Sequence, residues 1–214
     1  MSDLPGFGTM DIHDRGGPHD FTYEDAGATP PQPGLTPSQT VGPFFAYGLV
    51  PGPYGYAHRD IHSNDLAGDA VEGERITIEG QVLDGAGTPI PDAMVEIVQA
   101  DSAGRYVTAP RNDGFTGYGR CGTGADGPDG RFRFRTVRPG ATSGAPFVTL
   151  VLIMRGLLNH AVTRMYFPEE TDDAVLAQVP EERRHTLVAE HIAPGRYRFD
   201  IRMQGSKETV FFDL

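Results

Sequence analysis

Cysteine is almost absent from this sequence: Cys121 is the single example among 214 residues. One thiol cannot form a disulfide within the chain, which is typical of proteins from a reducing compartment. No stretch approaches the roughly 20 consecutive apolar residues of a membrane-spanning helix. The first residues, MSDLPGFGTMDIHD, lack the basic and apolar regions of a signal peptide. Together these absences predict a cytoplasmic protein.

Basic side chains are also scarce, with 18 lysines and arginines against 29 aspartates and glutamates, and the formal net charge is -11. A surface that binds nucleic acid neutralises phosphates with clustered lysines and arginines. The charge balance therefore argues against a nucleic-acid partner.

Glycine and proline are plentiful instead, at 28 and 18 residues, while 38% of the chain is hydrophobic. This composition is typical of short strands joined by turn-rich loops, with enough apolar residues for a core. Residues 1–35 are rich in Gly, Pro, Asp and His and show neither strand nor helix periodicity, so we expect a flexible or draped extension. Residues 36–214 have the length of one ordinary domain.

Two segments of this domain have the pattern of β-strands. Residues 76–82 place Ile78 and Val82 on one face of an extended chain and Glu79 on the other, and residues 93–100 are mostly apolar and β-branched. The Gly- and Pro-rich DGAGTPIP between them predicts a turn, so we expect a hairpin. These features predict an all-β fold: an antiparallel β-sandwich with long loops, one short helix and an extended N-terminal arm.

Further strand patterns follow along the chain. Residues 131–137 alternate strictly, which predicts an edge strand, and residues 147–156 are the most hydrophobic run, which predicts a buried strand ending on Arg155. The glycine-rich residues 101–130 are expected to form a long loop. The helix is expected within residues 171–190, with Asp172 and Asp173 in its first turn. The remaining strands are expected at residues 160–167, 196–203 and 208–214.

Two loop segments carry residues that suit a binding site. TPSQTVGPFFAYGL, residues 36–49, combines turn hydroxyls and prolines with the large side chains of Phe44, Phe45 and Tyr47. It suits either a lid over one end of the sandwich or the lining of a pocket. His58 and His62 have the spacing of metal ligands on a helix, but the Gly, Pro, Ser and Asn around them argue against a helix. A metal site there is the weaker interpretation.

Four segments, taken together and in order, resemble the intradiol ring-cleavage dioxygenases. They are TPSQTVGPFF, GQVLDGAGTPIPDAMVEIVQADSAGRY, RFRFRTVRPG and YRFDIRMQGSKETVFFDL, and the resemblance covers about residues 36–214. Members of this family cleave an aromatic ring between two adjacent hydroxyls, using O2 and a non-haem Fe(III) held by two tyrosines and two histidines. Hard phenolate oxygens stabilise the ferric state, and the imidazoles complete an open site.

The resemblance places the four ligand positions at Tyr106, Thr142, Phe147 and Thr149. Tyr106 alone keeps a ligand side chain, because a phenylalanine and two threonines cannot replace a phenolate and two imidazoles. The resemblance therefore implies that this chain holds no metal and is not catalytically self-sufficient. We interpret Tyr106 as a packed or hydrogen-bonded tyrosine.

Loss of these ligands is typical of the alpha chain in two-chain members of the family, in which a homologous beta chain carries the Fe(III). The resemblance then implies a beta-chain partner, a higher-order alpha–beta oligomer, and a shared site for protocatechuate and O2. The expected product is 3-carboxy-cis,cis-muconate, a step of aromatic catabolism in the beta-ketoadipate pathway.

The same resemblance places Thr40, Gly42 and Pro43 at the border of the substrate and Arg155 beside its carboxylate. A guanidinium is always charged and can bind a carboxylate bidentately. An arginine at the end of an apolar strand is costly unless an anion meets it, although such a side chain can also snorkel to solvent.

Two other functions are compatible with parts of the sequence. The GQVLDGAGTPIPDAMVEI segment also resembles transthyretin-like modules, which bind or space rather than catalyse. Those modules are much shorter and lack RFDIRMQGSKETVFFDL. A self-sufficient catechol or hydroxyquinol dioxygenase is the third alternative, and the three replaced ligands argue against it.

Overall fold

The computed structural model describes residues 37–56, 63–124 and 129–213, and its strands form two sheets. The extension expected at residues 1–35 lies outside the described residues, as do His58 and His62. The first sheet has the order β4-β1-β8-β7, with β9 also paired to β1, and the second has the order β3-β2-β5-β6. In chain order the strands are β1 (Arg75–Leu83), β2 (Met94–Val98), β3 (Tyr118–Gly122), β4 (Arg131–Val137), β5 (Phe147–Ile153), β6 (Ala161–Tyr166), β7 (Glu190–Ala193), β8 (Arg196–Arg198) and β9 (Ile201–Arg202).

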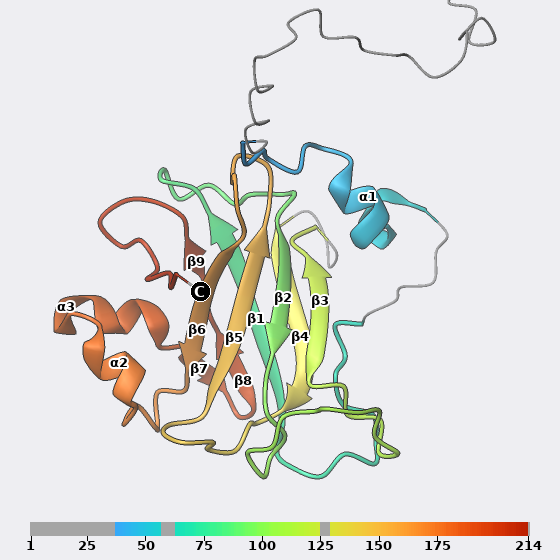
Figure 1. The fold of residues 1–214 in the computed structure, drawn as a ribbon, viewed down its shortest axis with the longest axis vertical. Helices are drawn as coiled ribbons and strands as arrows, with labels where there is room; N and C mark the ends of the chain where they lie inside the picture. Colours follow the sequence, from blue (N-terminus) through green and yellow to red (C-terminus); the bar gives the residue numbers. More distant parts are fainter. Residues whose placement is uncertain (1–36, 57–62, 125–128, 214) are drawn as a thin grey trace, which may run out of the picture. The chain divides into compact units, whose positions relative to one another are not determined.

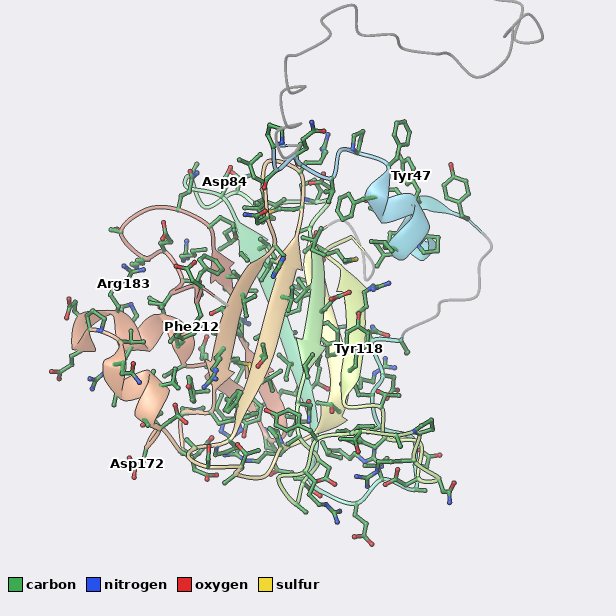
Figure 2. All side chains as sticks on the ribbon, in the orientation of Figure 1. Tyr47, Asp84, Tyr118, Asp172, Arg183 and Phe212 are labelled. Atoms are coloured by element: carbon green, nitrogen blue, oxygen red, sulfur yellow. The ribbon has the colours of Figure 1, made fainter. Side chains whose placement is uncertain are left out.

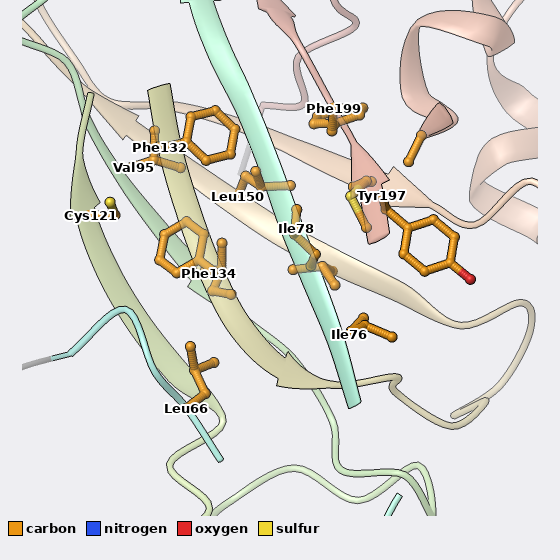
Figure 3. Close-up of a cluster of buried hydrophobic side chains, with 14 of the residues drawn as sticks. Leu66, Ile76, Ile78, Val95, Cys121, Phe132, Phe134, Leu150, Tyr197 and Phe199 are labelled. Atoms are coloured by element: carbon orange, nitrogen blue, oxygen red, sulfur yellow. The ribbon is translucent and has the colours of Figure 1, made fainter. Parts of the chain in front are cut away.

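The predicted β-sandwich is confirmed, because the two sheets stack as layers (Figure 1) around a shared apolar core (Figure 3). Phe132, Phe134 and Ile78 of the first sheet and Val95 and Leu150 of the second are fully buried there. Full burial of side chains of this size stabilises the fold by about 1.5–3 kcal/mol each. The strict alternation of β4 therefore has the physical cause that the sequence indicated, and β4 does lie at the edge of its sheet.

The hairpin expected from residues 76–100 is wrong, because β1 and β2 belong to different sheets. The N–H of Ile90 donates to the carbonyl of Val82 at 2.8 Å, so the connection turns back on β1 for one bridge before it leaves for the other layer. Pro91 has no N–H to continue this pairing. Strands that face each other across a core need the same alternation as strands in a hairpin, so the sequence pattern suits both.

The first sheet is mixed rather than purely antiparallel. β1 pairs antiparallel with β4 but parallel with β8 and β9. One predicted strand, residues 196–203, is divided into β8 and β9, because the side chain of Asp200 accepts the N–H of Gln81 at 3.0 Å and interrupts the backbone ladder. Residues 208–214 form no strand in their described part, where Phe212 makes an isolated bridge to Val162.

The long loop expected at residues 101–130 contains a strand, β3, which pairs with β2 along its whole length. The strand was not predicted because its segment is rich in glycine, which is typical of loops. Gly119 is needed for close packing, because a Cβ there would lie 2.5 Å from the Leu66 side chain. β7 was likewise not predicted.

A short helix is present in the expected segment, but Asp172 and Asp173 precede it instead of lying in its first turn. The Asp173 carboxylate accepts the N–H groups of Val175 and Leu176 at 2.9 and 3.0 Å and so caps α2 (Ala174–Gln178). Pro180 then separates α2 from α3 (Glu181–Arg184), which continues into the 3-10 turn η2 (His185–Leu187). Two further short elements, α1 (Phe45–Leu49) and the 3-10 helix η1 (Gly52–Tyr54), occupy the segment expected as loop. None of the helices in the described ranges is long and apolar enough to cross a membrane.

Candidate functional site

Arg155 lies just beyond the C-terminal end of β5, in the turn after Ile153 rather than on the strand itself. Alternate residues of β5 are fully buried and the others half-buried, so this strand covers the core with one face only. The Arg155 side chain is 55% exposed, and its Nε donates a very short hydrogen bond to the carboxylate of Asp92. Asp92 comes from the connection between β1 and β2, so two distant segments meet at this end of the sandwich.

Thr40 is tied to the same turn. Its hydroxyl oxygen accepts the N–H of Gly156 at 3.0 Å, which fixes the loop around Thr40 beside Arg155. Gly42 has a φ of 71°, a left-handed conformation that favours glycine, and it redirects the chain into Pro43 and α1. The structure therefore brings Thr40 to the turn of Arg155 by a direct contact, and Gly42 and Pro43 by their place in the chain.

An exposed aromatic cluster adjoins this turn. The Tyr47 ring of α1 lies 5.6 Å from Phe44, 4.6 Å from Tyr54 and 5.7 Å from Tyr56, measured between ring centroids. Phe44 is 75% exposed. Figure 2 shows Tyr47 at the end of the sandwich that also holds the β1–β2 connection, marked there by Asp84. The sequence identified Phe44 and Tyr47 as large side chains but gave no reason to add Tyr54 and Tyr56.

Arg155, Asp92 and Tyr54 influence one another's ionisation. The hydrogen bond to Asp92 raises the pKa of Arg155, and the nearby phenols of Tyr54 and Tyr47 add to this. Burial raises the pKa of Tyr54, as does the charge of Asp92, while Arg155 opposes the rise. Arg155 is therefore charged and Tyr54 neutral near pH 7. Within the described part of the chain, the terminal nitrogens of Arg155 donate no hydrogen bond, so they are available to an anion.

The four positions expected to correspond to metal ligands lie near the opposite end of β5. Phe147 begins this strand, and the guanidinium of Arg164 lies 4.1 Å above its ring. Thr149 is directly opposite Arg164 in the β5–β6 register. Burial raises the pKa of Tyr106, and the nearby charge of Arg164 opposes this rise. Thr142 is exposed, in the loop before β5.

A buried carboxylate builds the turn that carries Tyr106. Asp101 is 2% exposed and accepts the N–H groups of Ala103 and Arg105 at 3.0 and 2.9 Å. It also accepts the guanidinium of Arg111 at 2.6 Å. Burial alone would raise the pKa of Asp101, but these hydrogen bonds prevail and lower it to about 2. Gly104 completes the turn with a φ of 78°, and a Cβ there would lie 2.1 Å from the carbonyl oxygen of Ala141.

These residues do not fit a ferric ion. Besides the phenol of Tyr106 they offer two threonine hydroxyls and a phenyl ring, where hard anionic oxygens and imidazoles are needed. The guanidinium of Arg164 brings a positive charge to the same place and would repel a cation. In the described ranges, no three His, Cys, Asp or Glu side chains gather as a metal site.

The two groups of residues are too far apart to serve one substrate. From Thr149 to the end of β5 at Ile153 the strand spans about 13 Å, and Arg155 lies in the turn beyond that end. Thr149 lies in the part of β5 that pairs with Arg164, whereas Arg155 lies beyond the other end of the strand. A catechol whose carboxylate reached Arg155 could not also contact Tyr106 and Thr149 of the same chain.

Comparisons with known proteins agree on one family. A family model described as Dioxygenase matches residues 50–146. The chain is 50% identical over 193 residues to the protocatechuate 3,4-dioxygenase alpha chain of Burkholderia cepacia, covering 84% of this chain and 97% of that protein. It is 34% identical over 175 residues to the beta chain from the same organism, covering 70% of this chain and 73% of that protein.

Solved structures support the fold. The dioxygenase domain of a dioxygenase and carbohydrate-binding protein fusion from Streptomyces sp. SirexAA-E aligns with a TM-score of 0.53 at 24% identity. The alignment covers 80% of this chain and 99% of that one. The 193-residue similarity to the alpha chain includes the C-terminal half that short transthyretin-like modules lack, so we set the non-catalytic alternative aside.

Proposed function

The chain belongs to the protocatechuate 3,4-dioxygenase alpha chains, within the intradiol ring-cleavage dioxygenases, and we propose that it completes the substrate pocket of an iron-bearing beta chain. As an alpha chain of a two-chain dioxygenase it has a beta chain as its partner. The family uses a non-haem Fe(III). The location of this ion on the beta chain, and the role of this chain's residues toward it, are our proposal.

One observation carries the proposal: Arg155 lies beyond one end of β5, whereas Phe147 and Thr149 lie near its other end. A substrate bound at Arg155 needs a metal centre within reach of its hydroxyls, and the described residues of this chain offer none there. A beta chain that docks on the surface around α1 can supply it. The exposed aromatic cluster at α1 supports this, because aromatic side chains are enriched in protein interfaces.

This chain's own residues then bind and orient the substrate. The terminal nitrogens of Arg155 hold the carboxylate of protocatechuate, and the turn of Gly42 and Pro43 limits the pocket on one side. Thr40 keeps this loop against the Arg155 turn through its hydrogen bond with Gly156. Fe(III) held by the beta chain would supply the oxidative chemistry on the catechol. Cleavage to 3-carboxy-cis,cis-muconate in the cytoplasm, by a higher-order alpha–beta oligomer, completes the proposal.

Iron content and visible absorption test whether the beta chain, and not this chain, holds the iron. We expect this chain, purified alone, to be colourless and to lack stoichiometric iron, because one phenol and an arginine do not form a ferric site. Co-expressed with the homologous beta chain, the complex should contain iron, absorb in the visible range and cleave protocatechuate. A lone chain with tyrosinate-to-iron charge transfer would contradict the proposal, since it would require ligands in this chain.

The Tyr106→Phe variant of the complex tests whether Tyr106 contributes to the metal site. Tyr106 is 45% exposed, and removal of one partly exposed hydroxyl changes stability by about 0.5 kcal/mol or less. We expect the iron content to be unchanged and kcat/KM for protocatechuate to stay within about twofold of wild type. Metal analysis and steady-state kinetics on the same preparation measure both, and loss of iron would show that Tyr106 contributes to the metal site.

A further inference from the structure

We propose that Asp92 is a positioning residue for Arg155 and thereby sets the preference of the enzyme for catechols that carry a carboxylate. This inference rests on the proposed function, in which Arg155 binds the substrate carboxylate. Asp92 itself does not touch the substrate. It acts through the guanidinium that it holds.

The backbone around Asp92 is fixed on both sides. Pro91 precedes it with a ring-locked φ. The N–H of Ala93 donates to the hydroxyl of Thr123 at 3.2 Å, and the N–H of Thr123 donates to the carbonyl of Ala93 at 2.9 Å. The Asp92 side chain is 20% exposed. Its carboxylate is therefore a rigid anchor just before β2, an interior strand of the second sheet.

Arg155 needs such an anchor. It lies in a turn next to Gly156, which has a φ of 89°, and more than half of its side chain is exposed. A free arginine side chain loses much rotamer entropy when it binds a ligand. Asp92 engages the Nε only, so the long side chain is ordered before substrate arrives while its terminal nitrogens stay available for a bidentate contact.

The sign of the effect distinguishes positioning from simple electrostatics. Asp92 is the acidic group that faces Arg155, and the other neighbours are the neutral phenols of Tyr47 and Tyr54. If the charge of Asp92 merely weakened the local positive potential, its removal would tighten the binding of an anionic substrate. If Asp92 positions Arg155, its removal weakens binding of that substrate despite the more positive potential.

Steady-state kinetics of the alpha–beta complex with two substrates test the inference. We expect Asp92→Asn to raise KM for protocatechuate by about tenfold, the factor that corresponds to ordering one long side chain in the binding step. For catechol, which has no carboxylate, KM and kcat should be unchanged. Asp92→Glu, which keeps the charge on a longer stem, should recover part of the loss. Asp69→Asn is the matched control for the change in net charge, because Asp69 is exposed and lies in the loop before β1.

The double variant Asp92→Asn/Arg155→Ala separates the possible outcomes. If Asp92 acts through Arg155, the double variant has the same KM for protocatechuate as Arg155→Ala. A lower KM in Asp92→Asn, or losses that add in the double variant, would overturn the positioning role. A loss in Arg155→Ala without any in Asp92→Asn would overturn this inference alone, whereas no loss in Arg155→Ala would overturn the proposed substrate contact. Catechol turnover and iron content show that each variant complex is folded, and Asp92→Ser provides a second truncation if Asp92→Asn does not assemble.

Discussion

Replacement of Arg155 by alanine is expected to raise KM for protocatechuate by about 10- to 100-fold in the alpha–beta complex. A charged, bidentate contact between a guanidinium and a carboxylate is among the stronger hydrogen bonds, and the partial exposure of Arg155 favours the lower part of this range of KM. The effect should fall on KM, because the carboxylate stays remote from the ring bond that breaks and is bound equally before and during the reaction. Kinetics with protocatechuate and with catechol measure it.

Two features make this test specific. The Gly156–Thr40 hydrogen bond uses a backbone N–H, so the variant retains the contact that holds the Thr40 loop. Arg135→Ala is the matched control, since Arg135 is 69% exposed and its removal changes the net charge equally. Iron content and kcat for catechol should be the same in both variants. An unchanged KM for protocatechuate in Arg155→Ala would remove this residue from the substrate site.

Replacement of Asp101 by alanine is expected to lower the free energy of unfolding by about 3 kcal/mol or more. The Asp101 side chain is 3% exposed, and each donor that loses this acceptor costs about 1–3 kcal/mol. Arg111 is 29% exposed and keeps its ion pair with Asp113, so loss of its pair with Asp101 adds less. The N–H groups of Ala103 and Arg105 also lose their acceptor. Denaturant unfolding of the alpha–beta complex at pH 7 measures the loss as a shift in the midpoint.

Two further variants serve as comparisons for this loss of stability: Asp101→Asn and Glu190→Ala. Asparagine keeps an acceptor for the backbone N–H groups but not the charge opposite Arg111, so its loss should be smaller. Glu190 is 67% exposed and lies 3.6 Å from Arg198, and exposed pairs of this kind contribute about 0–1 kcal/mol. Equal losses in Asp101→Ala and Glu190→Ala would mean that the buried carboxylate does not stabilise the fold as its contacts indicate.

The contribution of Asp101 also depends on pH. Its pKa falls from an ordinary value of 3.8 to about 2 in the folded chain. A carboxyl with a lowered pKa stabilises the folded state fully above its unfolded pKa, and the stabilisation is lost as the pH falls toward the folded pKa. The difference in unfolding free energy between wild type and Asp101→Asn should therefore shrink by about 2 kcal/mol between pH 5 and pH 2. A constant difference across this range would contradict the assignment.

The sequence predicted the features that depend on neighbouring residues. The alternation of Phe132, Phe134 and Thr136 placed β4 and its buried face, and Asp173 marked the start of α2. Both depend on periods and caps within a few residues, which are visible in one segment of chain. The glycine-rich β3 and the five-residue α1 were missed because tertiary contacts, rather than their own residues, stabilise them.

Arg155 could be identified from the sequence, but its partner could not. Asp92 is 63 positions away, and the two meet because the chain crosses between the layers after β1 instead of forming a hairpin. The contact between Arg164 and Phe147 also depends on tertiary structure, because the pairing of β5 with β6 brings them together. The sequence by itself indicated the two-layer β architecture through local periodicity and the family through the resemblance of four segments, because both can be recognised in short stretches of chain. Only the tertiary structure decided which charges meet and that Arg155 and Arg164 lie near opposite ends of β5, because strand pairing and crossing are set by contacts between distant segments.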